Sequence, residues 1–138
     1  MERHTRQRQA VLDALEGGGR ALTPPEILQA ARSAVPSLNL STIYRQIAAL
    51  QEEARLAKVL LPGQPARYEP VCGHREAGHH HHHFHCKLCD RVFALHTCPG
   101  SMQELVPKGF VVDAHEITLH GRCPDCARRP RAKAHANA

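Results

Sequence analysis

The stretch His79-His-His-His-His-Phe-His-Cys86-Lys-Leu-Cys89 decides how the second half of this 138-residue chain folds. It ends in a CxxC pair, Cys86 and Cys89, and a second pair, Cys123 and Cys126, follows near the C-terminus. Two distant CxxC pairs can place four thiolates around one tetrahedral Zn²⁺ ion. A site with four thiolates has no open coordination position, so we predict a structural zinc site whose binding energy supports folding.

The composition favours metal binding over a disulfide framework. The chain has six Cys and twelve His, no apolar run long enough to cross a membrane, and an N-terminus, MERHTRQRQ, unlike a signal peptide. We therefore expect a cytoplasmic protein, because thiols in that compartment stay reduced and are available as metal ligands.

The net charge of +5 is concentrated at the C-terminus. Four basic residues of the tail carry most of it: Arg128, Arg129, Arg131 and Lys133. The folded part is nearly neutral, so any contact with DNA must come from locally placed side chains. We interpret residues 127–138 as a disordered basic tail.

Residues 1–71 carry the pattern of a winged helix-turn-helix. Apolar spacing predicts a helix over residues 5–16, and Thr23, Pro24 and Glu26 predict a capping box that starts a second helix. Ser41 is the predicted cap of a third helix over residues 42–55. Two strands, residues 56–61 and 66–71, then form a hairpin around a Pro-Gly turn.

The second half has a different composition and predicts a small α/β unit over residues 79–126, joined by a hinge at 72–78. Its expected elements are strands at 79–86, 91–95, 110–112 and 115–120, with a short helix after Pro99 and Gly100. The whole chain is therefore expected to have an α+β fold, with a winged helix-turn-helix followed by a small α/β domain that holds the four-cysteine zinc site.

The histidine tract predicts ligands on two faces of one strand, because side chains alternate with a period of two. His81 and His83 share one face, which can meet Glu69 or Cys72. His80 and His82 share the other face, which can meet His96, Cys98 or His115. Imidazole and thiolate suit Zn²⁺, whereas a carboxylate in the set also admits Fe²⁺ or Mn²⁺.

The third predicted helix opens with side chains suited to DNA. Ser41, Thr42, Tyr44 and Arg45 lie near its N-terminus, where a recognition helix faces the major groove. Arginine can bind guanine or phosphate, and the other three can contact bases or backbone. On its own this pattern also fits an ordinary amphipathic helix, and the capped helix pair and hairpin favour DNA binding.

These motifs resemble the ferric uptake regulator (Fur) superfamily from Thr5 to Cys126. The resemblance rests on Thr5-Arg6-Gln7-Arg8, Ser41-Thr42-Ile43-Tyr44-Arg45, the tract His79 to His83, and the pairs Cys86/Cys89 and Cys123/Cys126. It implies a homodimer with an N-terminal winged helix, a C-terminal dimerisation domain and metal-dependent binding of operator DNA. Arg6 joins the expected DNA-binding residues on this basis.

Within the superfamily the sequence is most similar to the zinc uptake regulators (Zur). The resemblance implies a regulatory site with Cys72, His81 and His83, and an additional site with His80, His82 and His115. Ala21 stands where iron-sensing relatives often have a ligand histidine. The carboxylate usual in the additional site is missing, and His96 or Cys98 can substitute. Glu69 aligns with a carboxylate ligand of the iron-sensing group, so Glu69 and Cys72 both remain candidates.

These features predict a zinc-responsive repressor of metal uptake genes that binds operator DNA as a homodimer, with no membrane partner and no small organic substrate. Zinc is expected in the structural site and in the regulatory site, where iron or manganese is the alternative. Rival hypotheses are an iron-, manganese- or peroxide-responsive regulator of the same type, and a zinc storage or delivery protein, which the histidine run favours. An enzyme is not expected, because neither CxxC pair is preceded by proline and no open zinc position is implied.

Overall fold

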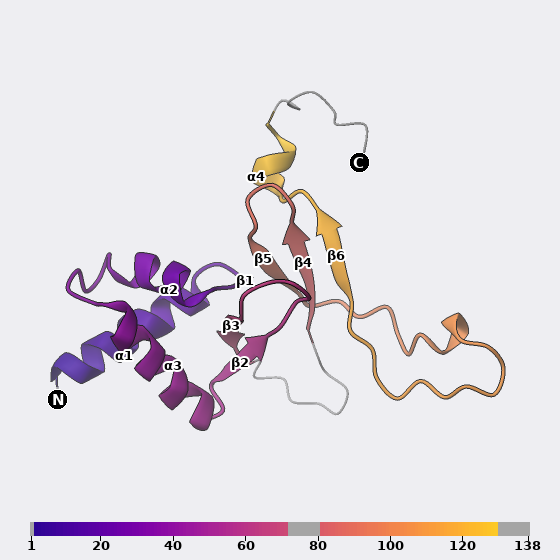
Figure 1. Cartoon of the computed structure of the whole chain (residues 1–138), viewed down its shortest axis with the longest axis horizontal. Coiled ribbons are helices and arrows are strands. Elements are labelled where there is room, and N and C mark those ends of the chain that lie inside the picture. The colour runs from indigo at the N-terminus through magenta and orange to yellow at the C-terminus, as the bar shows by residue number, and fades with distance from the viewer. Residues whose placement is uncertain (1, 72–80, 130–138) are drawn as a thin grey trace. The chain divides into compact units, whose positions relative to one another are not determined.

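The computed structural model describes residues 2–71 and 81–129, and it divides into two compact units, residues 1–81 and 82–138 (Figure 1). Each unit is described by itself. The predicted hinge at 72–78 lies outside the described residues. Within the described part, no helix is both long and apolar enough to cross a membrane.

The first unit has the predicted three helices and hairpin. In chain order its elements are α1 (Glu2–Glu16), β1 (Arg20–Ala21), α2 (Pro24–Ala31), α3 (Leu40–Glu52), β2 (Leu56–Val59) and β3 (Arg67–Pro70). Strands β2 and β3 pair antiparallel, with Leu56 opposite Pro70 and Val59 opposite Arg67. The helices and this two-stranded wing form a winged helix-turn-helix, which confirms the predicted fold of this half. The two-residue strand β1 was not predicted.

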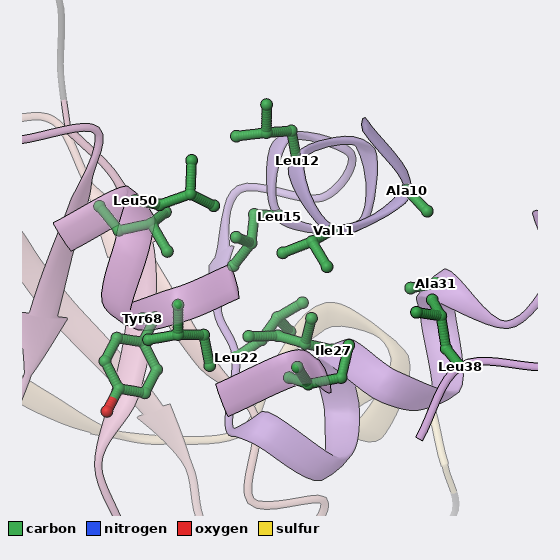
Figure 2. Close-up of a cluster of buried hydrophobic side chains, with 13 residues drawn as sticks. Ala10, Val11, Leu12, Leu15, Leu22, Ile27, Ala31, Leu38, Leu50 and Tyr68 are labelled. Carbon is green, nitrogen blue, oxygen red and sulfur yellow. The ribbon is translucent and has the colours of Figure 1, made fainter. Parts of the chain in front are cut away.

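One apolar core holds the three helices and the wing together (Figure 2). Val11 of α1, Ile27 of α2, and Ile43 and Leu50 of α3 are each 0% exposed. Tyr68 attaches the wing to this core, because its backbone exchanges two hydrogen bonds with Leu22, at 2.9 and 2.8 Å. Burial of these side chains is the main favourable term for the unit.

The capping box of α2 forms as predicted, whereas α3 begins earlier than predicted. Thr23 Oγ1 accepts a hydrogen bond from the Glu26 N–H at 3.3 Å, and the Thr23 N–H donates to Glu26 Oε1 at 2.9 Å. The cap of α3 is Asn39 rather than Ser41, because the Asn39 side-chain oxygen accepts from the Thr42 N–H at 2.9 Å. The helix ends at Glu52, and Ala54 has a φ of 57°.

Replacing Thr23 by alanine should destabilise the first unit by about 1 kcal/mol, since its hydroxyl group loses the hydrogen bond that it accepts from the Glu26 N–H and the one that it donates to Glu26 Oε1 at 3.0 Å. Urea unfolding followed by tyrosine fluorescence measures this change, because both tyrosines, Tyr44 and Tyr68, belong to the first unit. Thr23→Ser is the matched control and should retain most of the stability. An equal loss in both variants would contradict a capping role.

The second unit is a three-stranded sheet followed by a short helix (Figure 1). Its elements are β4 (His82–Cys86), β5 (Val92–Leu95), the 3-10 helix η1 (Gln103–Leu105), β6 (Thr118–Gly121) and α4 (Pro124–Ala127). Strand β4 is central: it pairs antiparallel with β5 and parallel with β6. A parallel neighbour requires a long crossover, and residues 96–117 supply it.

Several predicted boundaries in this unit were wrong. Residues 110–112 form no strand; instead the Gln103 amide donates to Phe110 O at 2.5 Å and accepts from the Val112 N–H at 3.0 Å. One side chain thus satisfies backbone groups that a strand neighbour would have satisfied. The expected helix after Gly100 is only η1. Strand β6 begins at Thr118, and α4 includes Ala127, the first residue of the predicted tail.

Candidate metal centres

The four cysteines of the two CxxC pairs meet at one end of the sheet and form what we call the four-cysteine cluster. Cys86 ends β4, Cys89 lies in the following turn, Cys123 caps α4, and Cys126 lies within α4. The parallel register places Cys86 beside Gly121, so the end of β6 delivers the second pair next to the first. All four Sγ atoms lie within 4.8 Å of one another.

This geometry fits a tetrahedral metal ion. Zinc–sulfur bonds of about 2.3 Å set tetrahedral sulfur–sulfur separations of about 3.8 Å. The Cys89 and Cys123 sulfurs are 3.8 Å apart. Phe84 and Phe93 pack against the cluster, and Cys86, Cys123 and Cys126 are buried. The four cysteines can therefore hold a metal ion in a closed and largely buried site.

Backbone donors and burial act in opposite directions on these thiols. Burial raises the pKa of Cys86, but backbone N–H groups of Cys123, Cys89 and Leu88 outweigh it and lower that pKa to about 6. The Cys123 N–H lies 3.4 Å from Cys86 Sγ. Burial and the neighbouring thiols raise the pKa of Cys126. A metal ion that binds all four as thiolates must therefore displace protons.

Gly121 permits the close approach of β6 to β4 beside the cluster. A Cβ atom added at this position would lie 3.1 Å from the ring of Phe84. The Lys87 N–H donates to Gly121 O at 2.8 Å, which ties the turn of the first pair to the strand that precedes the second. This glycine was not among the residues that we predicted to shape the site.

A second cluster contains His82, Cys98 and His115, whose ligand atoms lie within 4.8 Å of one another. The rings of His82 and His115 stack with centroids 4.9 Å apart, and Cys98 Sγ is 3.2 Å from His115 Nε2. His82 is buried, His115 is half-buried and Cys98 is exposed. Among the described residues, three donors of this kind account for three of the four positions around a tetrahedral ion, whereas the four-cysteine cluster supplies all four.

The backbone of Ile117 orients His82. The Ile117 N–H donates a hydrogen bond to His82 Nδ1 at 3.1 Å, and Ile117 directly precedes β6. A neutral imidazole has one nitrogen lone pair, and this hydrogen bond uses it. A metal ion bound by neutral His82 must therefore replace the Ile117 contact.

The structure brings together part of the predicted additional site. It groups His82, Cys98 and His115; it does not place the exposed His96 in this cluster, and His80 lies outside the described residues. Of the two predicted substitutes for the missing carboxylate, His96 and Cys98, the geometry favours Cys98.

The predicted regulatory residues are only partly described. Glu69 is buried on β3, and its Oε1 lies 3.8 Å from His81 Nδ1. His83 is half-buried on β4, and Cys72 lies outside the described residues. A pair that we did not predict lies near the four-cysteine cluster: His85 Nε2 is 2.7 Å from Asp90 Oδ1.

The third helix, α3, presents three of its four predicted DNA-binding side chains. Ser41, Tyr44 and Arg45 are exposed, whereas Thr42 is 5% exposed. Thr42 Oγ1 accepts a hydrogen bond from Arg45 at 3.0 Å. Its burial argues against contact with DNA and indicates that it positions Arg45. Arg6 is exposed on α1.

Comparisons with known proteins agree with this architecture. A model of the ferric uptake regulator family matches residues 2–120. The transcriptional regulator FurA of Mycobacterium bovis is 31% identical over 136 residues, covering 96% of this chain and 88% of that protein. A solved structure of a zinc-bound manganese uptake regulator has a TM-score of 0.71 at 22% identity, covering 85% of this chain and 87% of the other. For the Helicobacter pylori ferric uptake regulator Fur, the TM-score is 0.63 at 24% identity, with coverage of 91% and 83%.

The family model and the FurA relative are those of transcriptional regulators rather than enzymes, and the clustered thiols and imidazoles of the second unit could hold metal ions. The predicted resemblance is confirmed at the level of the family. The chain belongs to the ferric uptake regulator family.

Proposed function

We propose that this regulator is a zinc-responsive repressor that binds operator DNA as a homodimer and controls metal uptake genes. The observation that carries the zinc assignment is the donor set of the His82–Cys98–His115 cluster. Its ligand atoms are nitrogen and sulfur, without a carboxylate among the three residues. Imidazole with thiolate suits zinc, whereas iron(II) and manganese(II) sites more often include carboxylates.

The four-cysteine cluster is proposed as the permanent structural zinc site. Its four sulfurs are mutually close, and three of its cysteines are buried. A buried site with no open position exchanges metal poorly and contributes to folding rather than to sensing. We therefore assign sensing to the sites that contain histidine.

The proposed regulatory ligands are His81 and His83 with Glu69 or Cys72. Support comes from the 3.8 Å separation of Glu69 Oε1 and His81 Nδ1 and from the burial of Glu69. A buried carboxylate beside an imidazole is a suitable oxygen donor for a cation. Cys72 is the alternative sulfur donor. The proposed DNA-binding domain spans residues 1–71, the hinge spans residues 72–78, and the dimerisation domain spans residues 79–126.

Zinc would act by population shift. The metal must bind the DNA-competent arrangement of the dimer more tightly than the alternatives, because only differential affinity moves the equilibrium. The exposed Tyr44 and Arg45 of α3, with Arg6 and Ser41, are the side chains proposed to contact the operator. Thr42 would hold Arg45 in position through their hydrogen bond.

A titration of DNA binding against buffered free metal tests the function. A labelled DNA fragment selected from a random pool by the zinc-loaded protein serves as operator, and fluorescence anisotropy reports binding. Zinc should strengthen binding by about 5- to 150-fold, the usual range of allosteric coupling. Cys72→Ala or Glu69→Ala, and His81→Ala, should reduce this gain, while His120→Ala, an exposed histidine outside the proposed sets, should retain it.

The other results of this titration distinguish the rivals. A response to Fe²⁺ or Mn²⁺ alone would overturn the zinc assignment and leave the family unchanged. Binding that no metal affects would overturn metal regulation. If the protein exchanges zinc rapidly and selects no DNA fragment from the random pool, the result would favour a storage or delivery protein.

A further inference from the structure

The two thiol-containing clusters of the second unit differ in their access to solvent. Cys86, Cys123 and Cys126 are 0, 2 and 2% exposed, and Cys89 is half-buried. Cys98 is exposed, on the crossover that joins β5 to β6. Among the described cysteines, it is therefore the one that a small solute in water reaches most directly.

The surroundings of Cys98 are those of a reactive sulfur rather than of an inert buried thiol. Its Sγ lies 3.2 Å from His115 Nε2 and 3.7 Å from Gly100 O. A cysteine acts as a metal ligand in its thiolate form, which is also the form that oxidants attack. Oxidation of cysteine follows thiolate character and exposure, and Cys98 combines both features when it serves as a ligand.

We propose that Cys98 is an oxidation site through which hydroperoxides control metal occupancy of the His82–Cys98–His115 cluster. This inference rests on the proposed metal-binding function of that cluster. The Cys98 thiolate attacks one peroxide oxygen, so that the oxygen–oxygen bond breaks and a sulfur–oxygen bond forms. The second oxygen of hydrogen peroxide leaves as hydroxide, and the sulfur, oxidised by two electrons, becomes sulfenic acid.

The consequence for the cluster follows from its small number of donors. Oxidation removes the only thiolate of the three, and His82 and His115 remain. Without a metal ion, His82 keeps the hydrogen bond from Ile117 that metal binding must displace. The oxidised cluster therefore favours the metal-free form. Two equivalents of a low-molecular-weight thiol reverse the step, giving Cys98 thiol, a disulfide and water.

The test uses the full chain loaded with zinc and treated with substoichiometric hydrogen peroxide. Dimedone traps sulfenic acid, peptide mass spectrometry locates the adduct, and a chromogenic chelator reports released zinc. Cys98 should be labelled before every other cysteine, and the zinc held by its cluster should be released together with labelling. In a parallel sample without dimedone, which blocks the sulfur irreversibly, reduction by a dithiol should allow the protein to rebind the same amount of zinc.

Two variants distinguish a failure of the oxidation proposal from a failure of the proposed metal site. Cys98→Asp keeps a ligand that peroxide does not oxidise, so it should retain its zinc under peroxide. Cys98→Ser should bind less zinc than the unmodified chain before any peroxide is added, and equal zinc content would overturn both the proposed site and the switch. The oxidation proposal alone fails if the site holds zinc but the first dimedone adduct lies at Cys72 or in the four-cysteine cluster. It also fails if Cys98→Asp releases as much zinc under peroxide as the unmodified chain does.

Discussion

Replacing Cys123 by serine is expected to abolish metal binding at the four-cysteine cluster and to unfold the second unit. Structural zinc in finger-type sites contributes about 10 to 16 kcal/mol, which is as large as the total stability of a typical domain, about 5 to 15 kcal/mol. The second unit has little else to replace it, because the cluster of three buried cysteines, with Phe84, Cys89 and Phe93 around them, forms most of its described core, and Val92 is its other buried apolar side chain.

The first unit provides an internal reference for this experiment. Zinc content gives the metal loss, and amide NMR signals show whether residues of β4 to β6 lose dispersion while those of α1 to α3 keep it. Cys98→Ser is the control for folding: it should lose only the zinc of the His82–Cys98–His115 cluster and keep dispersed signals in the second unit, since Cys98 lies outside the four-cysteine cluster. Dispersed second-unit signals in the zinc-free Cys123→Ser protein would show that this metal site is not needed for folding. Chelation of the unmodified protein should give the same spectrum as Cys123→Ser.

Truncating Ile43 to alanine should destabilise the first unit by about 2 to 5 kcal/mol. Ile43 is fully buried in α3, between the other helices and the wing, and its removal costs transfer free energy and leaves a cavity. Urea unfolding monitored by tyrosine fluorescence should show an earlier transition. The proposed DNA binding should weaken only through the loss of folded protein.

The adjacent residue is the matched control. Tyr44 is 51% exposed, so Tyr44→Ala should change stability by no more than about 0.5 kcal/mol. The Tyr44→Ala variant keeps Tyr68 as the fluorescent reporter. It should bind the operator more weakly although it remains fully folded. If Tyr44→Ala destabilised the unit as much as Ile43→Ala, our assignment of the exposed face of α3 would be wrong.

The first unit could be predicted closely because its signals are local. Thr23, Pro24 and Glu26 specify one helix start within four residues, and apolar spacing specifies the buried face of each helix. The cap of α3 was predicted two residues too late, because Asn39 and Ser41 are both good caps. The choice depends on which side chain reaches the Thr42 N–H, and composition does not show this.

The second unit was less predictable because its contacts are distant in sequence. The meeting of the two CxxC pairs was predicted from their chemistry. The segment at Phe110 to Val112 looked like a strand, but the Gln103 side chain takes its backbone hydrogen bonds. The preference for Cys98 over His96 likewise depends on the path of the crossover. No local pattern determines that path.

The crossover of residues 96–117 leaves the sheet and returns to it between two anchored points. At one end of the β4–β6 pair the four-cysteine cluster fixes the strands, and at the other Cys98 and His115 bring the base of the crossover together. Closing a flexible loop costs little more as it lengthens, about 0.6 kcal/mol for each doubling. Evolution can therefore insert or delete residues beyond this base while both clusters remain intact. The crossover is the part of the unit where length and sequence are free to diverge.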